Sequence, residues 1–356
     1  MNIILISQSY FPSVGGVQVH VKEIAERLAK ENNVAVYTLD HTAKRTTEVE
    51  INGIKIKRFG CMSVSYGIEV PSKEFAHTLK NSCADIVHLH SVHTLLPYYT
   101  YRVIPADSKF VITPHYLGRG HNFIRDMLFR LYRSKLSNVL MAADKLLCES
   151  KYEKSLILQD FSVQADKVVV IPNGISQVMH FNDTNDNERD PFKILFVGRL
   201  ERYKNADKVV KALSLLHKFN LVVVGDGPEK DRISKLIEHL NLSDRVRIVS
   251  NLSQEELLKE YKTSSILVVP SLRENFSIVV AEALSMGLQT IVANSSALSE
   301  FITDGYAYGI SLPVTPEKIA KAVSDVWDKP KPKNTYVSYT WDMVVRELIC
   351  VYESLC

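Results

Sequence analysis

The strongest constraint on the fold is an alternation of short apolar runs with longer helical patterns, which occurs twice along the 356 residues. The first series of apolar runs comprises Ile3–Ser7, Val34–Thr38, Ile86–His90 and Phe110–Thr113. The second comprises Lys193–Val197, Leu221–Val224, Val246–Val249, Ile266–Val269 and Thr290–Ala293. Short strands that alternate with helices are typical of parallel sheets covered by helices on both faces. The sequence therefore predicts an α/β protein.

The two series predict two doubly wound, Rossmann-like domains. We expect an N-terminal domain over residues 1–172, a second domain over 173–335, and a C-terminal helix over 336–356 that packs back on the first domain. The polar segment Asn182–Asp190 between the two series is expected to be a loop. Sheets of this kind bind ligands at the carboxyl ends of their strands, so a cleft between the two domains is the expected site.

Composition narrows the function without identifying it. The chain has 46% hydrophobic and 23% charged residues, which is ordinary for a globular protein. A net charge of +3 is too small to predict nucleic-acid binding. The five cysteines are scattered and form no CxxC pair, which favours a reduced, cytoplasmic protein without a zinc site. The apolar runs are too short to span a membrane, and the N-terminus predicts a buried strand rather than a signal peptide.

Two glycine motifs follow predicted strands. Gly15 and Gly16 precede a helical pattern, where glycines let a backbone approach a ligand and the helix start offers N–H groups to a phosphate. A tight strand–helix turn explains the same pair equally well. Gly225 and Gly227 form a second candidate, but neither motif has the three glycines of a dinucleotide fingerprint. A Rossmann dehydrogenase is therefore a poor interpretation.

Charged residues follow two strands of the second series. Arg199 and Lys204 come after Lys193–Val197, and two cations at a strand end suit a diphosphate, although solvated surface charges would look the same. Glu274 lies in the loop after Ile266–Val269, and Glu282 lies in the helix that follows. That helix places Glu282 about 7–8 Å from its N-terminus, roughly the distance from a diphosphate to the ribose of one nucleotide. Both cations are expected to be solvent-exposed.

Together these residues resemble a known family, the retaining glycosyltransferases of family 4 with the two-domain GT-B fold. The resemblance spans nearly the whole chain and depends on the order of six motifs. They are Gly15-Gly16, Thr113-Pro114-His115, the linker Ile171–Ile175, Gly198-Arg199-Leu200 with Lys204, Gly225–Pro228, and Glu274 with Glu282. This sequence departs from the family at Asn275 and Ser277, where glycines are frequent, and at Ser176, where aspartate is frequent.

The resemblance implies roles for individual residues. The catalytic residues are expected to be His115, Arg199, Lys204 and Glu274. The donor-binding residues are expected to be Gly15, Gly16, Asn275, Phe276, Ser277 and Glu282. Arg199 and Lys204 would hold the donor diphosphate, Glu274 would contact the sugar, and Glu282 the ribose. His115 would line the reaction centre, with the acceptor in the first domain and the donor in the second.

Three histidines of the first domain lie in or just after one predicted strand and could be taken for a metal site. His88 and His90 share one face of a strand and His93 follows, but no carboxylate lies at metal-ligand spacing. We therefore expect no metal there, and histidines that are either hydrogen-bonded or on the acceptor side.

A basic segment lies between the two glycine motifs. Residues 119–135 include Arg119, Arg125, Arg130, Arg133 and Lys135 against one acid. Such a helix can dock on an anionic membrane surface, or it can be an ordinary helix with a basic outer face.

The function predicted from these residues is metal-independent transfer of a hexose from a nucleoside-diphosphate sugar to a hydroxyl acceptor, and the resemblance implies that the configuration is retained. The acceptor would be a glycan, a glycolipid or a lipid-linked saccharide. No cofactor, metal or nucleic acid is expected. Two alternatives remain open at this point: a nucleotide-sugar epimerase of the same fold, and a nucleotide-sugar binding protein without catalysis. The protein is expected in the cytoplasm, with membrane docking at the cytoplasmic face as a further hypothesis.

Overall fold

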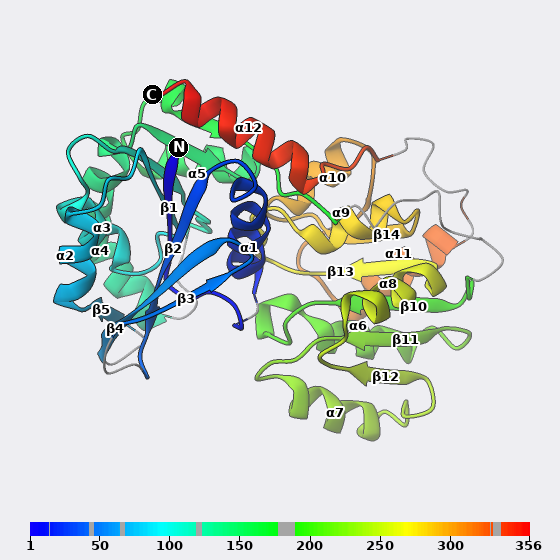
Figure 1. The fold of residues 1–356 in the computed structure, drawn as a ribbon. Coiled ribbons are helices and arrows are strands. Elements are labelled where there is room, and N and C mark those ends of the chain that lie inside the picture. Colours follow the sequence, from blue (N-terminus) through cyan, green and yellow to red (C-terminus); the bar gives the residue numbers. More distant parts are fainter. Residues whose placement is uncertain are drawn as a thin grey trace. The chain divides into compact units, whose positions relative to one another are not determined.

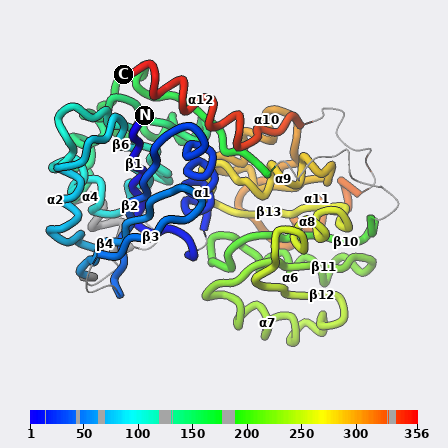
Figure 2. Tube along the Cα trace, in the orientation of Figure 1, coloured from blue at the N-terminus to red at the C-terminus, as the bar shows by residue number. Residues whose placement is uncertain are grey.

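The computed structural model describes residues 1–13, 15–42, 46–64, 68–118, 123–176, 189–327, 329 and 336–356 (Figure 1). The chain forms two compact units. Unit 1 consists of Met1–Gly174 together with Tyr339–Cys356, and unit 2 consists of Ile175–Ser338. Both chain termini consequently belong to unit 1, as the trace in Figure 2 shows.

Unit 1 is built on a nine-stranded sheet with a parallel centre. Its parallel strands are β2 (Asn33–Asp40), β1 (Asn2–Ser7), β6 (Ile86–His90), β7 (Lys109–Thr113), β8 (Lys145–Cys148) and β9 (Val168–Val170), in this spatial order. At one edge, β4 (Ile54–Val64) pairs parallel with β2 and antiparallel with both β3 (Thr47–Ile51) and β5 (Ile68–Pro71). The central strands are almost wholly buried, which explains their continuous apolar sequences.

Six α-helices accompany this sheet among the described residues. They are α1 (Gly16–Leu28), α2 (Lys73–Lys80), α3 (Leu96–Val103), α4 (Phe123–Ala142), α5 (Lys151–Asp160) and α12 (Trp341–Glu353). The C-terminal helix α12 packs on α1, as the sequence predicted, and Arg27 Nε lies 2.7 Å from the Asp342 carboxylate. Gly174 is required beside α12, because a Cβ atom there would lie 2.4 Å from the backbone nitrogen of Trp341.

Unit 2 contains a six-stranded sheet in which every strand pair is parallel. Its spatial order is β12 (Val246–Val249), β11 (Asn220–Val224), β10 (Lys193–Val197), β13 (Ile266–Val269), β14 (Gln289–Ala293) and β15 (Tyr308–Ile310). The helices are α6 (Ala206–Leu213), α7 (Lys230–His239), α8 (Gln254–Thr263), α9 (Ile278–Ser285), α10 (Leu298–Thr303) and α11 (Pro316–Trp327). Its core is one continuous hydrophobic cluster.

The predicted α/β class is confirmed, and all nine strands expected from apolar runs are present within two residues at either end. In the described part of the chain, no helix combines the length and the apolar character that a membrane span requires.

Candidate functional site

In unit 1, polar side chains gather where neighbouring parallel strands end. His90 is the last residue of β6, His115 follows β7, and Glu149 directly follows β8. These three strands are adjacent in the sheet, so their carboxyl ends bring the three side chains together. His20 reaches the same place from α1, and Asn173 from the segment after β9.

Hydrogen bonds connect these side chains into one buried network. The Glu149 carboxylate accepts from Asn173 Nδ2 at 2.8 Å and lies 3.0 Å from His115 Nδ1. Asn173 Oδ1 in turn lies 2.6 Å from His20 Nδ1. Because Asn173 donates through its nitrogen, its oxygen is the acceptor and His20 carries the proton on Nδ1. A second carboxyl, Glu153, accepts from the backbone N–H groups of Tyr116 and Glu149.

Burial and charge shift the pKa values of this network in different directions. Burial opposes ionisation of Glu149, but His115, His20 and Asn173 outweigh that effect and lower its pKa to about 2. Burial and the Glu149 charge raise the pKa of Glu153 to about 8. Burial works to lower the pKa of His115, yet the Glu149 carboxylate raises it above the usual value. Burial lowers the pKa of His20 to about 4. The network thus holds one carboxylate, one protonated carboxyl and a neutral His20 near pH 7.

The histidines of β6 and the loop after it have different environments. His88 is hydrogen-bonded at both ring nitrogens, to Tyr352 Oη at 2.6 Å and Thr113 Oγ1 at 2.8 Å, which supports the non-metal interpretation for this residue. His93 Nε2 lies 3.1 Å from the backbone oxygen of His115. Neither buried ring nitrogen of His90 has a partner among the described residues, so the first of the two expectations, a hydrogen-bonded histidine, is wrong for this residue, and the acceptor-side role stays a prediction. Its ring instead lies against that of His88, with ring centroids 4.1 Å apart.

Gly15 and Gly16 lie at the start of α1 in unit 1. Gly15 is extended and a Cβ atom there would approach Gln18 Oε1 to 2.5 Å, whereas Gly16 has open space around it. No side chain caps this helix start. The Gln18 side chain is flexible and could move away from a Cβ atom on Gly15, and the exposed Gly16 lies at a helix start that no side chain caps. Donor binding by this pair stays a prediction.

In unit 2, the predicted diphosphate cations have unequal surroundings. The Arg199 side chain is 66% exposed and pairs with Glu201 at 3.0 Å. The expectation that Lys204 is exposed is wrong, because its side chain is only 17% exposed. Its Nζ lies 2.5 Å from Glu274 Oε1 and 5.6 Å from the centre of the Tyr203 ring. Burial works to lower the pKa of Lys204, but the Glu274 carboxylate outweighs it and raises that pKa. The lysine is therefore charged.

The loop that carries Arg199 is held by the second glycine motif. The backbone N–H of Leu200 donates to the Asp226 carbonyl at 2.8 Å. A Cβ atom on Gly225 would lie 2.0 Å from the Gly198 oxygen, and one on Gly227 would lie 2.7 Å from the Leu200 oxygen. Both glycines therefore permit two strand-end loops to touch, which positions Arg199 and gives the motif a structural reason.

The residues expected at the donor sugar precede α9. Glu274 is fixed by its backbone, whose N–H donates to Ser296 Oγ at 3.0 Å. Asn275 Oδ1 is buried and has no hydrogen-bond partner among the described residues. Phe276 packs against Phe301, with ring centroids 5.7 Å apart. Ser277 has φ +91°, a conformation that favours glycine, and its side chain does not cap α9. The first N–H groups of this helix are therefore free of a side-chain cap and can bind an anion.

Glu282 lies one turn into α9, where the sequence placed it. Its carboxyl accepts a hydrogen bond from the buried Tyr261 hydroxyl at 2.8 Å. Burial raises the pKa of Glu282 to about 7, against the opposing effect of the Tyr261 hydrogen bond. The oxygen that Tyr261 leaves free can accept from a hydroxyl group. The roles of Glu274 and Glu282 stay predictions, but Lys204 and Glu274 are in direct contact.

Sequence reasoning missed four residues of the unit 1 network: His20, Glu149, Glu153 and Asn173. Asn173 belongs to the linker motif noted above, and Glu149 follows β8, a strand that the apolar runs did not predict. The strand-end rule would have found Glu149 once β8 was known.

The basic segment is only partly described. Arg119 and the side chain of Arg125 lie outside the described residues. Arg133 donates to the Asp160 carboxylate at 2.8 Å and lies over the Phe161 ring. Arg130 and Lys135 are exposed. Arg133 is thus held in an ion pair with Asp160, whereas Arg130 and Lys135 lie on the surface.

Two Rossmann-like units, one of which carries cations and an uncapped helix at its strand ends, define the GT-B class of glycosyltransferases. Residues 14–177 match the family described as Glycosyltransferase Family 4, and residues 180–341 match the family described as Glycosyl transferases group 1. The two matches together span most of the chain, which is a glycosyltransferase of the GT-B class.

Known relatives agree with this assignment over the whole chain. An uncharacterized glycosyltransferase of Methanocaldococcus jannaschii, MJ1607, is 26% identical and covers 99% of this chain and 98% of its own. The GPI3 subunit of phosphatidylinositol N-acetylglucosaminyltransferase from Saccharomyces cerevisiae is 23% identical, over 99% of this chain and 83% of its own.

Solved structures share the fold. Sucrose-phosphate synthase from Thermosynechococcus elongatus matches with a TM-score of 0.81 at 20% identity, over 99% of this chain and 98% of its own. Anabaena HepE, solved in complex with UDP and glucose, matches with a TM-score of 0.75 at 14% identity, over 99% of each chain.

Proposed function

We propose that this glycosyltransferase moves a hexose from a nucleoside-diphosphate sugar to a hydroxyl acceptor, with retention of configuration and without a metal ion. The observation that carries the proposal is the group of residues at the strand ends of unit 2. Arg199 and Lys204 are cations there, Glu274 contacts Lys204, and α9 begins without a side-chain cap. A diphosphate needs such cations and N–H groups.

The chemistry places its largest demand on the leaving group. The bond between the anomeric carbon and the diphosphate oxygen breaks, and negative charge accumulates on the diphosphate. Fixed cations and helix N–H groups stabilise this charge more in the transition state than in the bound donor, and removal of one such donor typically costs about 3–4 kcal/mol of barrier. Arg199 offers a planar fork and Lys204 a point charge. The leaving oxygen is then the proposed base for the acceptor hydroxyl, which attacks the same face.

The remaining groups orient the donor. The Glu274 carboxylate, bonded to Lys204, can accept from sugar hydroxyls while its lysine faces the diphosphate. Glu282, held by Tyr261, can accept from the ribose. His115 of unit 1 remains the residue expected beside the transferring sugar.

The relatives support the substrate classes. HepE was solved with UDP and glucose, which supports a nucleoside-diphosphate donor and a saccharide in this fold. The yeast relative is named for transfer to phosphatidylinositol, which supports a lipid-linked acceptor for this chain. A lipid-linked acceptor also fits docking of the exposed Arg130 and Lys135 on an anionic membrane surface.

Thermal-shift screening with UDP, GDP, ADP and their sugars tests the donor half of the proposal. A ligand that binds only the native state adds about 2.7 kcal/mol of stability at a hundredfold excess over its dissociation constant. We expect one nucleotide series to raise the unfolding temperature, and Arg199→Ala to reduce that rise. A Lys218→Ala variant, which changes an exposed lysine of unit 2 outside the site, serves as the matched control. Absence of a shift with every nucleotide would overturn the proposal.

A further inference from the structure

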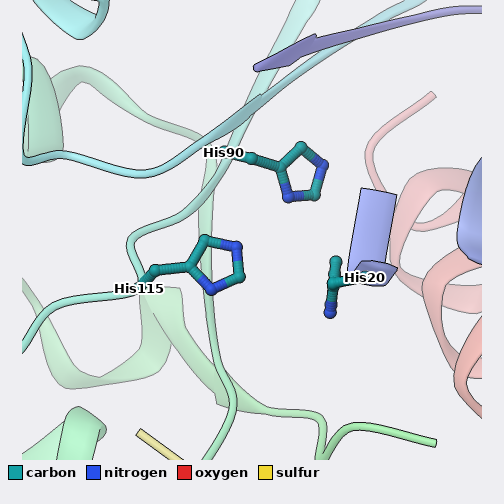
Figure 3. A group of neighbouring side chains, drawn as sticks. All are labelled: His20, His90 and His115. Carbon is teal, nitrogen blue, oxygen red and sulfur yellow. The ribbon is translucent and has the colours of Figure 1, made fainter. Parts of the chain in front are cut away.

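Three histidine rings of unit 1 face one another in its interior (Figure 3). His20 comes from α1, His90 from the end of β6, and His115 from the segment after β7. One ring nitrogen of each lies within 4.8 Å of those of the other two. The three residues are 4%, 1% and 5% exposed, so that water can hardly solvate their nitrogens.

Their hydrogen bonds determine which nitrogens are available. His20 donates through Nδ1 to Asn173 Oδ1, and His115 donates through Nδ1 to the Glu149 carboxylate. Nε2 of His20, Nε2 of His115 and both nitrogens of His90 are buried and have no partner among the described residues. Neutral imidazoles with protonated Nδ1 present a bare lone pair at Nε2. Buried polar atoms without partners are uncommon and require an explanation such as an ion.

We propose that His20, His90 and His115 bind one divalent cation of the zinc class, with His20 and His115 coordinating through Nε2. Imidazole nitrogen is a preferred ligand of Zn²⁺, Co²⁺ and Ni²⁺, and three histidines with one open position form a known ligand set. Zinc–nitrogen bonds of about 2.0–2.1 Å in a tetrahedral site put the nitrogens roughly 3.3 Å apart. No pair of these nitrogens must therefore approach by more than about 1.5 Å, which rotation of the rings can provide.

The groups behind the histidines suit a bound cation. Metal-binding histidines usually donate their other N–H to a carboxylate or a carbonyl oxygen, which fixes the ring and strengthens the ligand. Glu149 and Asn173 occupy these two positions here, at 3.0 Å and 2.6 Å. The buried Glu149 carboxylate supplies negative charge beside the ion.

This ion belongs to unit 1 and is independent of the diphosphate chemistry proposed for unit 2. It would hold α1 and the ends of β6 and β7 together, which is a structural role. An imidazole bound through Nε2 still presents its carbon edge, so His115 can also line the reaction centre.

The test uses the full chain without a polyhistidine tag. Metal content is measured after purification, and metal-free protein is titrated with Zn²⁺ and Co²⁺ by calorimetry and absorption spectroscopy. We expect one ion per chain, the ligand-field bands of a tetrahedral Co²⁺ site, and a higher unfolding temperature with Zn²⁺. His90→Gln should abolish stoichiometric binding. His217→Gln and His239→Gln, which change exposed histidines of unit 2, are the matched controls and should bind as the parent does.

Glu149→Gln provides a variant that keeps all three ligands. Loss of the second-sphere carboxylate should weaken Zn²⁺ binding by 10- to 100-fold. The proposal is overturned if the parent binds no stoichiometric Zn²⁺ or Co²⁺. It is equally overturned if His90→Gln, shown to be folded by circular dichroism, binds as tightly as the parent, or if the Co²⁺ bands are absent.

Discussion

Lys204 Nζ lies 2.5 Å from Glu274 Oε1, and the two side chains are only 17% and 13% exposed. The cation expected at the diphosphate and the carboxylate expected at the sugar therefore neutralise each other before any donor binds. A donor bound as proposed must share this pair, with its phosphate at the lysine and its sugar hydroxyls at the glutamate. The contact links two residues that lie 70 positions apart in the sequence.

The first prediction separates the two cations. Arg199→Ala and Lys204→Ala should each lower turnover by about two to three decades, because the leaving diphosphate loses a partner. Their stabilities should differ. Arg199 is largely exposed, so its loss costs about 0–1 kcal/mol, whereas loss of Lys204 leaves a partly buried Glu274 unpaired and costs roughly 1–3 kcal/mol. Turnover and urea unfolding of both variants measure these effects. Near-normal turnover in both would remove the diphosphate assignment.

The second prediction concerns the two glutamates. Glu274→Gln keeps the size of the side chain but removes its charge, so turnover should collapse while free nucleoside diphosphate still binds. Glu282→Ala should weaken nucleotide binding by roughly 1.5–3 kcal/mol, the usual value of a hydrogen bond to a charged group. Calorimetric titration with the nucleoside diphosphate, beside turnover, distinguishes the two roles. The opposite pattern would mean that the donor is placed the wrong way round along α9.

The third prediction follows from the pKa of Glu282, which burial raises to about 7. The ionised carboxylate accepts ribose hydroxyls better than the protonated form, so nucleotide affinity should fall as pH drops from 8 to 6. Tyr261→Phe removes a hydrogen bond that lowers this pKa, so the midpoint of the pH dependence of nucleotide affinity should move to higher pH in this variant. Glu282→Gln should retain only the pH dependence of the nucleotide itself. Calorimetry at three pH values is sufficient, and an identical pH profile for the parent and Glu282→Gln would refute the role of this carboxyl.

The fourth prediction concerns anionic membranes. Arg130 and Lys135 are exposed, and each basic residue near such a surface contributes about 1 kcal/mol, screened beyond a Debye length of about 8–10 Å. The double variant Arg130→Ala/Lys135→Ala should therefore bind anionic vesicles roughly 30-fold more weakly at low salt. Lys218→Ala/Lys235→Ala, on exposed positions of unit 2, is the matched control. If neither salt nor the double variant Arg130→Ala/Lys135→Ala changed cosedimentation with the vesicles, α4 would be an ordinary helix with a solvated basic face.

The sequence predicted the parallel strands well because a strand buried on both faces must be apolar throughout. It did not predict the hairpin of β3 and β4. Charged and apolar residues alternate there around Asn52 and Gly53, because one face of the hairpin is polar, so the hairpin contains no continuous apolar run. The strands β9 and β15 have only three residues each and give too little pattern to recognise, and β8 (KLLC) starts with a lysine and has only two leucines and a cysteine as its apolar run.

The candidate site was predicted in part. Arg199, Lys204, Glu274 and Glu282 could be named because strand ends are where ligands bind in such sheets. The Lys204–Glu274 ion pair could not be foreseen, since its members follow different strands whose order in the sheet is set by tertiary packing. The histidine cluster of unit 1 was missed for the same reason: His20, His90 and His115 lie on different elements, and only the folded sheet and α1 bring their rings together.

Product analysis tests the central claim most directly. The protein is incubated in EDTA with the donor found by thermal shift and with candidate acceptors, and the products are followed by mass spectrometry and proton NMR. The account predicts one nucleoside diphosphate released per glycoside formed, with the anomeric configuration of the donor retained. Arg199 and Lys204 carry the diphosphate charge in this account, and the chain has no Asp-x-Asp pair, so chelation of Mg²⁺ and Mn²⁺ should leave turnover unchanged. An isomerised donor without glycoside, an inverted product, or activity that only Mg²⁺ or Mn²⁺ restores would contradict it.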